Sequence, residues 1–206
     1  MNECGKDNTA TVRELTAELW ADLETLFGRN GACGGCWCQW WRTAGVEHWN
    51  DVKGEVARAR LRQQVREGRA HGVLAYEDGR PVGWCSFEPR STLPRVQRSR
   101  SFKGLEAEGA WFVGCFFVKR SYRRRGIAEL MLNKALEYMK RDGAEVVEAR
   151  PRDTHGAKQP DAFVYTGTRA MFERCGFAAV EGRRGAAVLC KRIRKQGEGS
   201  IGDSSA

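Results

Sequence analysis

Residues 118–128, with the sequence VKRSYRRRGIA, mark a change from strand to helix. The apolar run before them, residues 111–118 (WFVGCFFV), is typical of a strand covered on both faces. After them, apolar residues recur at helical spacing over 126–141, and Asp142-Gly143 ends the pattern. The stretch therefore predicts a junction between a buried strand and an amphipathic helix.

Basic residues crowd this junction. Five cationic side chains lie within residues 119–125, at the start of the predicted helix. A helix start leaves backbone N–H groups unpaired and carries partial positive charge, so it binds phosphate groups. Gly126 permits a backbone geometry that a Cβ would obstruct, and Ala128 keeps the first turn slim. These features predict an anion cradle made mainly of main chain, with a solvated basic surface as the alternative.

The chain around the junction predicts one mixed α/β domain over residues 9–192, between polar tails at 1–8 and 193–206. Patterns of apolar and turn-forming residues predict helices over 19–27, 51–67 and 168–175, and strands near 9–15, 72–76, 81–87, 145–149, 177–180 and 186–192. In the second helix, Val52, Val56 and Val65 are expected to point inward. Residues 88–109 are expected to form a basic, solvated loop.

The composition limits the class of protein. The 206 residues include 35 Lys and Arg against 26 Asp and Glu, and the net charge of +9 suits nucleic acid, an anionic membrane surface or a phosphate-bearing small molecule. We expect no membrane partner or secretory signal, because no apolar run is long enough for either. Eight cysteines without a signal predict reduced thiols in the cytoplasm.

The junction resembles the signature of the GNAT superfamily of N-acetyltransferases, Arg/Gln-x-x-Gly-x-Gly/Ala after a strand. Here Arg123-x-x-Gly126-x-Ala128 follows Phe116-Phe117-Val118. The hairpin upstream and residues 171–177 (MFERCGF), which look like the family's closing helix and Gly-Phe turn, extend the resemblance over residues 9–192. It implies an α/β GNAT fold: a mixed, mostly antiparallel central sheet with a V-shaped gap, flanked by helices.

The resemblance also implies that acetyl-CoA is the acyl donor and lies in that gap. The pantetheine arm would pair with the main chain of Phe116 and Val118, and an N–H near Phe117 would polarise the thioester carbonyl. The pyrophosphate would be held by residues of the junction, namely Arg123, Arg124, Arg125, Gly126, Ile127 and Ala128. The implied reaction moves the acetyl group to a primary amine, on a small molecule or a peptide, by direct attack.

The groups that would move protons depart from the family pattern. Many members carry a tyrosine donor where this chain has Phe172, and some carry a glutamate base where it has Phe112. The remaining candidates are Tyr165 as the donor and Glu148 as the base, with Asp153 or Asp161 nearby. Because both usual positions are vacant, a GNAT-shaped domain that binds CoA without catalysis is an alternative.

A segment rich in cysteine and tryptophan, GGCWCQWWR at residues 34–42, resembles one found in a bacterial subgroup of the family. Cys33, Cys36 and Cys38 have no second pair of ligands, so we predict no structural metal. Cys115, in the middle of an apolar run, is predicted to be an inert thiol. Four tryptophans either pack the core or line an acceptor pocket: Trp37, Trp40, Trp41 and Trp49.

A basic nucleic-acid-binding module is the alternative from another class. Such a module needs exposed aromatic residues among base-contacting ones. Here the aromatic residues cluster in apolar runs such as 111–117, which predicts that they are buried and disfavours this alternative. The sequence therefore predicts a cytoplasmic N-acetyltransferase that is a monomer or a homodimer.

Overall fold

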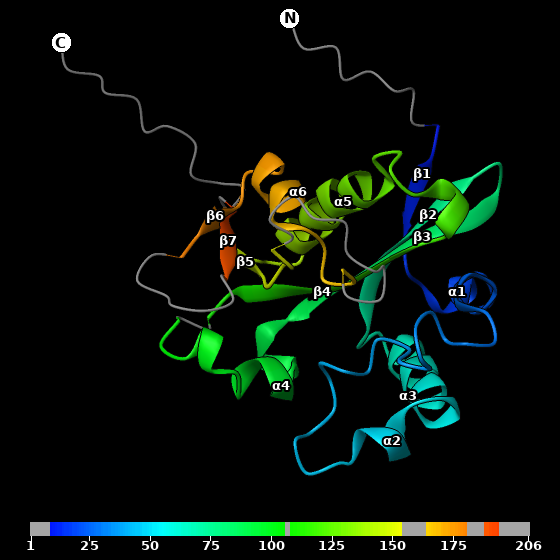
Figure 1. Ribbon diagram of the computed structural model, residues 1–206, viewed down its shortest axis with the longest axis horizontal. Coiled ribbons are helices and arrows are strands. Elements are labelled where there is room, and N and C mark those ends of the chain that lie inside the picture. Colours follow the sequence, from blue (N-terminus) through cyan, green and yellow to red (C-terminus); the bar gives the residue numbers. More distant parts are fainter. Residues whose placement is uncertain (1–8, 106–107, 154–163, 181–187, 194–206) are drawn as a thin grey trace, which may run out of the picture.

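A seven-stranded sheet with the order β1-β2-β3-β4-β5-β7-β6 organises the chain (Figure 1). The computed structural model describes residues 9–105, 108–153, 164–180 and 188–193, so the predicted tails fall outside it except for Ile193. The strands are β1 (Thr11–Glu14), β2 (His71–Glu77), β3 (Arg80–Pro89), β4 (Ala110–Val118), β5 (Val146–Ala149), β6 (Ala178–Ala179) and β7 (Leu189–Arg192). Only the β4–β5 pair is parallel among these strands, which confirms the predicted mixed, mostly antiparallel sheet.

Helices cover both faces of the sheet. They are α1 (Trp20–Phe27), α2 (Trp49–Val52), α3 (Glu55–Arg66), α4 (Pro94–Gln97), α5 (Ile127–Arg141) and α6 (Arg169–Arg174). The cores place α5 and α6 on one face, and α1 and α3 on the other, where Figure 1 also shows α2 and α4. None of the helices in the described residues has the length and apolar character needed to cross a membrane.

Strand β4 carries a bulge at Gly114. Ser86 pairs with Cys115 and Phe87 with Val113, so Gly114 is an extra residue that has no partner on β3. A bulge reverses the alternation of side chains beyond it. Phe116 therefore joins the core under α5 and α6, and Cys115 joins the core on the face of α1 and α3.

The gap predicted between two central strands begins just before this bulge. Strands β4 and β5 pair from Ala110 to Val113, and β4 continues alone to Val118. Beyond Val113, the chain ahead of α6 approaches β4 instead, since the N–H of Phe116 donates to the carbonyl of Tyr165 at 2.6 Å. The sheet therefore opens beside the strand that leads into α5.

The helix predicted over 51–67 is interrupted at Gly54, and the expectation that Val56 points inward is wrong. The N–H of Gly54 donates to the carbonyl of Gly35 at 2.8 Å, and Gly54 has a φ of +87°. A Cβ on Gly35 would lie 2.8 Å from the Gly54 nitrogen, so this approach requires glycine. The helix restarts after the break in a register that leaves Val56 44% exposed, although Val52 and Val65 are buried as expected.

The expectation of a solvated basic loop over 88–109 is also wrong in part. Strand β3 extends to Pro89, and α4 and two short 3-10 turns follow. Leu93, Val96 and Phe102 are buried in a third core beneath this segment. Arg90 is buried as well, because its guanidinium faces a carboxylate on β5.

Candidate functional site

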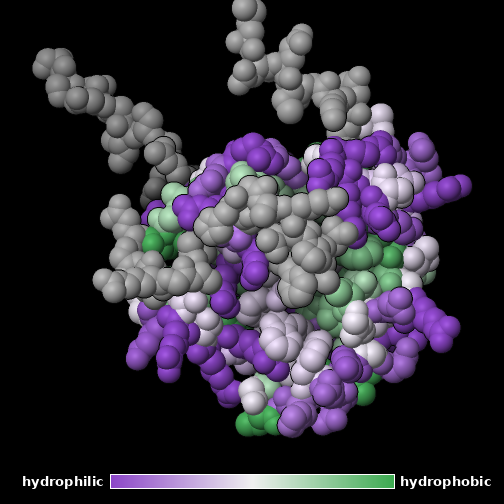
Figure 2. Space-filling model, viewed as in Figure 1, coloured by the Kyte–Doolittle hydropathy of each residue, from purple (hydrophilic) through white to green (hydrophobic). Residues whose placement is uncertain are grey.

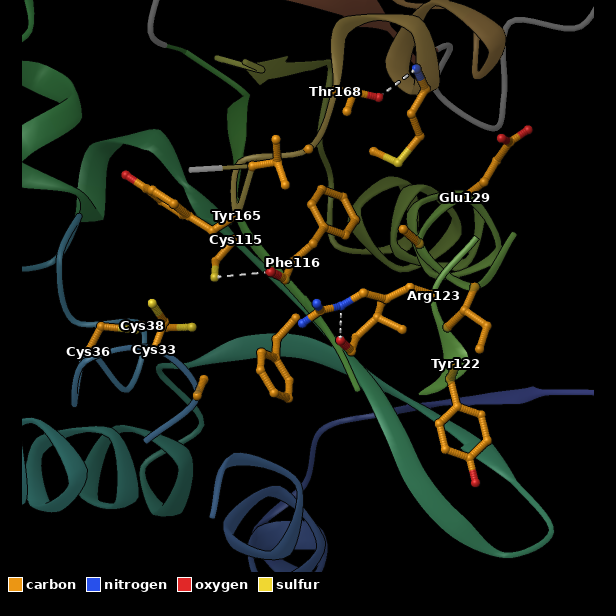
Figure 3. Close-up of a pocket in the computed structure, with 18 of the residues that line it drawn as sticks. Cys33, Cys36, Cys38, Cys115, Phe116, Tyr122, Arg123, Glu129, Tyr165 and Thr168 are labelled. Atoms are coloured by element: carbon orange, nitrogen blue, oxygen red, sulfur yellow. Dashed lines mark hydrogen bonds between the residues drawn. The ribbon is translucent and has the colours of Figure 1, made fainter. Parts of the chain in front are cut away.

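A cavity of about 820 Å³ lies where β4 runs past the end of β5. Its walls come from the end of β4, the turn into α5, the segment ahead of α6, and the loop between α1 and α2. Figure 3 shows Tyr122, Arg123 and Glu129 at one end and the cysteines at the other.

The first end contains the residues predicted to form an anion cradle. Its described lining residues, which we call the phosphate cradle, are Arg123, Arg124, Gly126, Ile127 and Ala128. Gly126 is the N-cap of α5, with a φ of +80°, and is exposed. A left-handed N-cap without a side chain leaves the leading amides of the 15-residue α5 open to a ligand.

The arginines of the junction point in different directions. The Nε of Arg123 donates to the carbonyl of Val118 at 2.8 Å inside the cavity. Arg125 forms an ion pair with Glu77 on β2, and it is absent from the described residues that line the cavity. The sequence analysis missed Arg174 on α6, which lines the same end and pairs with Glu129 at 2.9 Å. Its position depends on tertiary packing and has no local sequence signal.

The middle of the cavity is lined by Phe116, Phe117 and Val118, whose contact with a cofactor stays a prediction. The amide that faces the gap belongs to Phe116, whereas Phe117 packs against Phe27 on the opposite face. Two main-chain groups there already have partners, because the Phe116 N–H binds the Tyr165 carbonyl and the Val118 carbonyl binds Arg123. A ligand that pairs with either group has to exchange these partners.

Tyr165 is the sequence-predicted proton donor, and it lines the cavity between the two ends. Figure 3 shows it beside Cys115, with Phe116 and Arg123 to one side. Burial, and then the nearby Cys115 thiol, raises the pKa of Tyr165. The phenol is therefore protonated over an extended pH range and can donate a proton to a leaving group.

Glu148, the sequence-predicted base, lies on β5 in a different environment. Its carboxylate faces the Arg90 guanidinium at 2.6 Å, and both side chains are buried. Arg90 also donates to the carbonyl of Leu105 at 2.9 Å. Neither Glu148 nor Asp153 is among the described residues that line the cavity, and Asp161 lies outside the described residues. The role of Glu148 as a base stays a prediction without support from its position.

We expect Glu148→Gln to lower the free energy of unfolding by about 3 kcal/mol, because it removes the negative charge facing a buried guanidinium. Denaturant titration measures the loss. Glu173→Gln, which breaks an exposed ion pair with Arg169, is the matched control and should leave stability nearly unchanged. Unchanged stability of Glu148→Gln, together with a kcat about 100-fold lower, would assign Glu148 to the reaction instead.

The second end of the cavity is formed by thiols and indoles. We call this surface the thiol–indole wall: Cys33, Cys36, Cys38, Trp40, Trp41 and Trp49. Trp37 does not belong to it, because its ring is 4% exposed and packs against Trp20 and Phe27. Trp37 therefore packs the core, whereas Trp40, Trp41 and Trp49 reach the cavity, and their contact with an acceptor stays a prediction.

The thiols of this region lie close to one another and affect one another's pKa. The Nε1 of Trp84 donates to the Cys38 sulfur at 3.1 Å, and the Cys115 thiol donates to the carbonyl of Phe116 at 3.8 Å. The neighbouring Cys115 thiol lowers the pKa of Cys38, and the same contact, with burial, raises the pKa of Cys115. Burial raises the pKa of Cys36 to about 11. Cys115 and Cys36 are thus held protonated.

We expect the purified protein to contain no stoichiometric zinc, as measured by elemental analysis. A structural zinc site needs four Cys or His ligands, and no group of three metal-ligating side chains with suitable geometry occurs in the described part of the chain. One zinc ion per chain, with loss of stability on chelation, would contradict this prediction.

Solved structures share this architecture. An N-acetyltransferase from Staphylococcus aureus Mu50 is 14% identical, with a TM-score of 0.53 over 90% of this chain and 99% of its own. An acetyltransferase from Salmonella typhimurium with its cofactor acetyl-CoA is 15% identical, with a TM-score of 0.52 over 94% of this chain and 99% of its own. A GNAT family N-acetyltransferase from Escherichia coli in complex with CoA is 15% identical, with a TM-score of 0.51 over 93% of this chain and 85% of its own. The fold is that of the GNAT N-acetyltransferases.

A match between the sequence and a family model identifies the same family. The model of the acetyltransferase (GNAT) family matches residues 36–177, which is more than half of the chain and includes α5 and the turn before it. No curated protein sequence matches the chain. The chain belongs to the GNAT acetyltransferase family, whose members use acetyl-CoA, and the predicted membership and fold are confirmed.

Proposed function

We propose that this protein is an acetyl-CoA-dependent N-acetyltransferase that acetylates a primary amine by direct attack. The observation that carries the proposal is the continuity of one cavity, which is lined by the phosphate cradle, by the end of β4 beyond its pairing with β5, and by Tyr165. A donor that spans this cavity would place its phosphates at one end and its thioester near Tyr165. Family membership supports acetyl-CoA as that donor.

The phosphate cradle would hold the pyrophosphate through the leading amides of α5. Backbone N–H groups at a helix start point toward an anion, and the helix dipole favours negative charge there. Arg123 and Arg124 add positive charge along the same wall. The pantetheine arm would follow Phe116 and Val118, in exchange for their present partners.

Acetyl transfer needs a neutral amine and a proton for the departing thiolate. In the proposed reaction the amine nitrogen bonds to the thioester carbon, the carbon–sulfur bond breaks, and Tyr165 gives its proton to the CoA sulfur. The acylated nitrogen releases one proton to water, and the Tyr165 phenolate regains one from water. Tyr165 is suited to this role because it lines the cavity and its raised pKa keeps it protonated. We assign no base, since Glu148 is outside the cavity lining.

The experiment that tests the function is acetyl-CoA turnover, followed as release of free CoA thiol, with and without candidate amines. Amine-dependent release with formation of the acetylated amine is the expected result. Binding of acetyl-CoA without turnover on any amine would instead favour the alternative, a CoA-binding domain without catalysis. The nucleic-acid alternative is disfavoured by the burial of Trp111, Phe112 and Phe116.

We also propose the cytoplasm as the place of action. Cys33 is exposed, and Cys36 and Cys38 lie beside it in the thiol–indole wall. Free thiols that line a working cavity suit a reducing compartment.

A further inference from the structure

The thiol–indole wall differs in charge from the rest of the cavity. Among the described residues that line the cavity, Glu129 alone carries a carboxylate, and Arg174 pairs with it at 2.9 Å. Figure 3 shows Glu129 on the side of Arg123, away from Cys33, Cys36 and Cys38. A cationic acceptor at the wall would meet no compensating carboxylate from the described residues, and burying an unpaired ammonium group is costly.

The indoles of the wall do not form a cage for a cation. Trp40 and Trp49 meet edge to face, with ring centroids 5.2 Å apart. The guanidinium of Arg95 lies 4.0 Å from the centroid of Trp40, so a positive charge already covers one face of that ring. A second cation at this pair would be repelled, because cation–π attraction is opposed by a like charge nearby.

The same wall offers a fixed apolar surface to an aromatic ring. The Nε1 of Trp41 donates to the carbonyl of Gly114 at 2.9 Å, and Trp41 packs edge to face on Phe112 at 5.2 Å. A Cβ on Gly114 would approach the Trp41 ring to 3.0 Å, so the bulge glycine makes room for the indole. Rigid indoles favour a planar ligand, since aromatic rings stack or meet edge to face. On the face shown in Figure 2, pale residues lie below the centre and green residues to the right of it, with hydrophilic residues among and around them.

The groups around Tyr165 are poor acceptors for a proton. The thiols of Cys36 and Cys115 have raised pKa values and stay protonated. The pKa of Cys38 is lowered, but its sulfur is buried and already accepts a hydrogen bond from Trp84. Among the described residues of the cavity, none is therefore placed to take a proton from an alkylammonium substrate, which would have to lose it to bulk water before it could attack.

We propose that the acceptor is an arylamine, a primary amine bonded directly to an aromatic ring, which packs against the thiol–indole wall. This inference rests on the proposed function and names its substrate class. The ring delocalises the nitrogen lone pair, so an arylamine is uncharged at neutral pH and needs no base before attack. A carbon–nitrogen bond forms and the carbon–sulfur bond breaks. The thiolate takes the proton of Tyr165, the strongly acidic acylated nitrogen then releases its own proton to water, and water returns a proton to the Tyr165 phenolate.

Two isomeric acceptors test whether the rate of acetylation depends on the basicity of the amine, because they contain the same number of carbon atoms. In 4-ethylaniline the amine is on the ring, and in 2-phenylethylamine it is on the alkyl chain. Only about one molecule in a thousand of the second is uncharged at pH 7, taking the pKa of about 10 typical of an alkylammonium group. We expect kcat/KM for 4-ethylaniline to be at least about tenfold higher at pH 7, and this ratio to fall as the pH rises toward 9.

A substitution in the wall tests where the ring binds. Trp40→Leu should raise KM for 4-ethylaniline by about fivefold to tenfold, because the aromatic contact is lost, and should leave the thermal stabilisation by acetyl-CoA unchanged. Val46→Ala is the matched control, since Val46 is in the same loop, is 87% exposed and is not a lining residue. Its KM for 4-ethylaniline should equal that of the unchanged protein.

The outcomes separate this inference from the proposed function. Equal or faster acetylation of 2-phenylethylamine or spermidine at pH 7 would overturn the arylamine assignment and leave the acetyltransferase standing. An unchanged KM in Trp40→Leu would overturn the placement of the ring. Acetyl-CoA binding without acetylation of any amine would overturn the proposed function itself. If Cys38→Ala abolishes turnover of 2-phenylethylamine, Cys38 serves as a base. The cavity then has a proton acceptor for an alkylammonium substrate, and the preference for an arylamine is overturned.

Discussion

The variant Gly126→Val is expected to lose the thermal stabilisation that acetyl-CoA gives to the unchanged protein. Acetyl-CoA at about 100 times its dissociation constant should stabilise the fold by about 2.7 kcal/mol, or about 5–10 °C in melting temperature. Gly126 has a φ of +80° at the start of α5. A branched side chain there would strain the turn and occupy the space of the phosphate, although the net charge stays the same. Differential scanning fluorimetry with and without acetyl-CoA measures the shift.

A matched control is available at the other end of the same helix. Gly143 has a φ of +87°, and a Cβ there would meet nothing within 4 Å. Gly143→Val should cost stability for the same conformational reason and keep the full acetyl-CoA shift. Arg98→Ala removes an exposed charge and should also keep most of the shift, whereas a nucleic-acid binder would lose affinity with each arginine removed. A folded Gly126→Val with the full shift would contradict the phosphate cradle.

Tyr165→Phe is expected to lower kcat by about 10²- to 10⁴-fold while acetyl-CoA still binds, because it removes the proposed proton donor. Burial raises the pKa of Tyr165, so the protonated, active form persists to higher pH than for an exposed tyrosine. The fall of kcat at alkaline pH should therefore begin above the usual tyrosine range, and this dependence should vanish in the variant. Steady-state kinetics across a pH series measures both effects.

Tyr138→Phe is the control for this substitution. Tyr138 lies on α5, stacked with Lys134 and Arg141 and absent from the cavity lining. It should keep kcat and the pH profile of the unchanged protein. A kcat within about threefold of normal in Tyr165→Phe would assign the proton to solvent or to another group. The melting temperature of Tyr165→Phe should change little, because no described residue accepts a hydrogen bond from the phenol.

Local sequence predicted the main elements where a single strong pattern existed. The apolar run before the junction, the stripe of α5 and the Asp78-Gly79 turn each depend on neighbours along the chain, so their positions could be predicted closely. The break between α2 and α3 could not, because its cause is the contact of Gly54 with Gly35, which is distant in sequence. Local patterns contain no information about such approaches.

For the same reason, only part of the candidate site could be predicted from the sequence. The phosphate cradle could be predicted, since its amides, glycine and arginines are consecutive. The burial of Arg90 against Glu148 could not, because the two residues are 58 positions apart and each is commonly exposed. Likewise, the composition around residue 37 does not separate Trp37, which is in the core, from Trp40, which is in the wall.

The bulge at Gly114 has a consequence for how this sequence can change over generations. Side chains along β4 can be exchanged one at a time while the strand keeps its two faces. Deleting Gly114 would leave Cys115 and Phe116 on their present sides of the sheet, because Val113 and Cys115 already pair with successive residues of β3. The deletion would, however, remove the carbonyl that accepts the hydrogen bond of the Trp41 indole. Descendants of this sequence can therefore tolerate many substitutions along β4, whereas loss of Gly114 would release Trp41 from its place in the cavity wall.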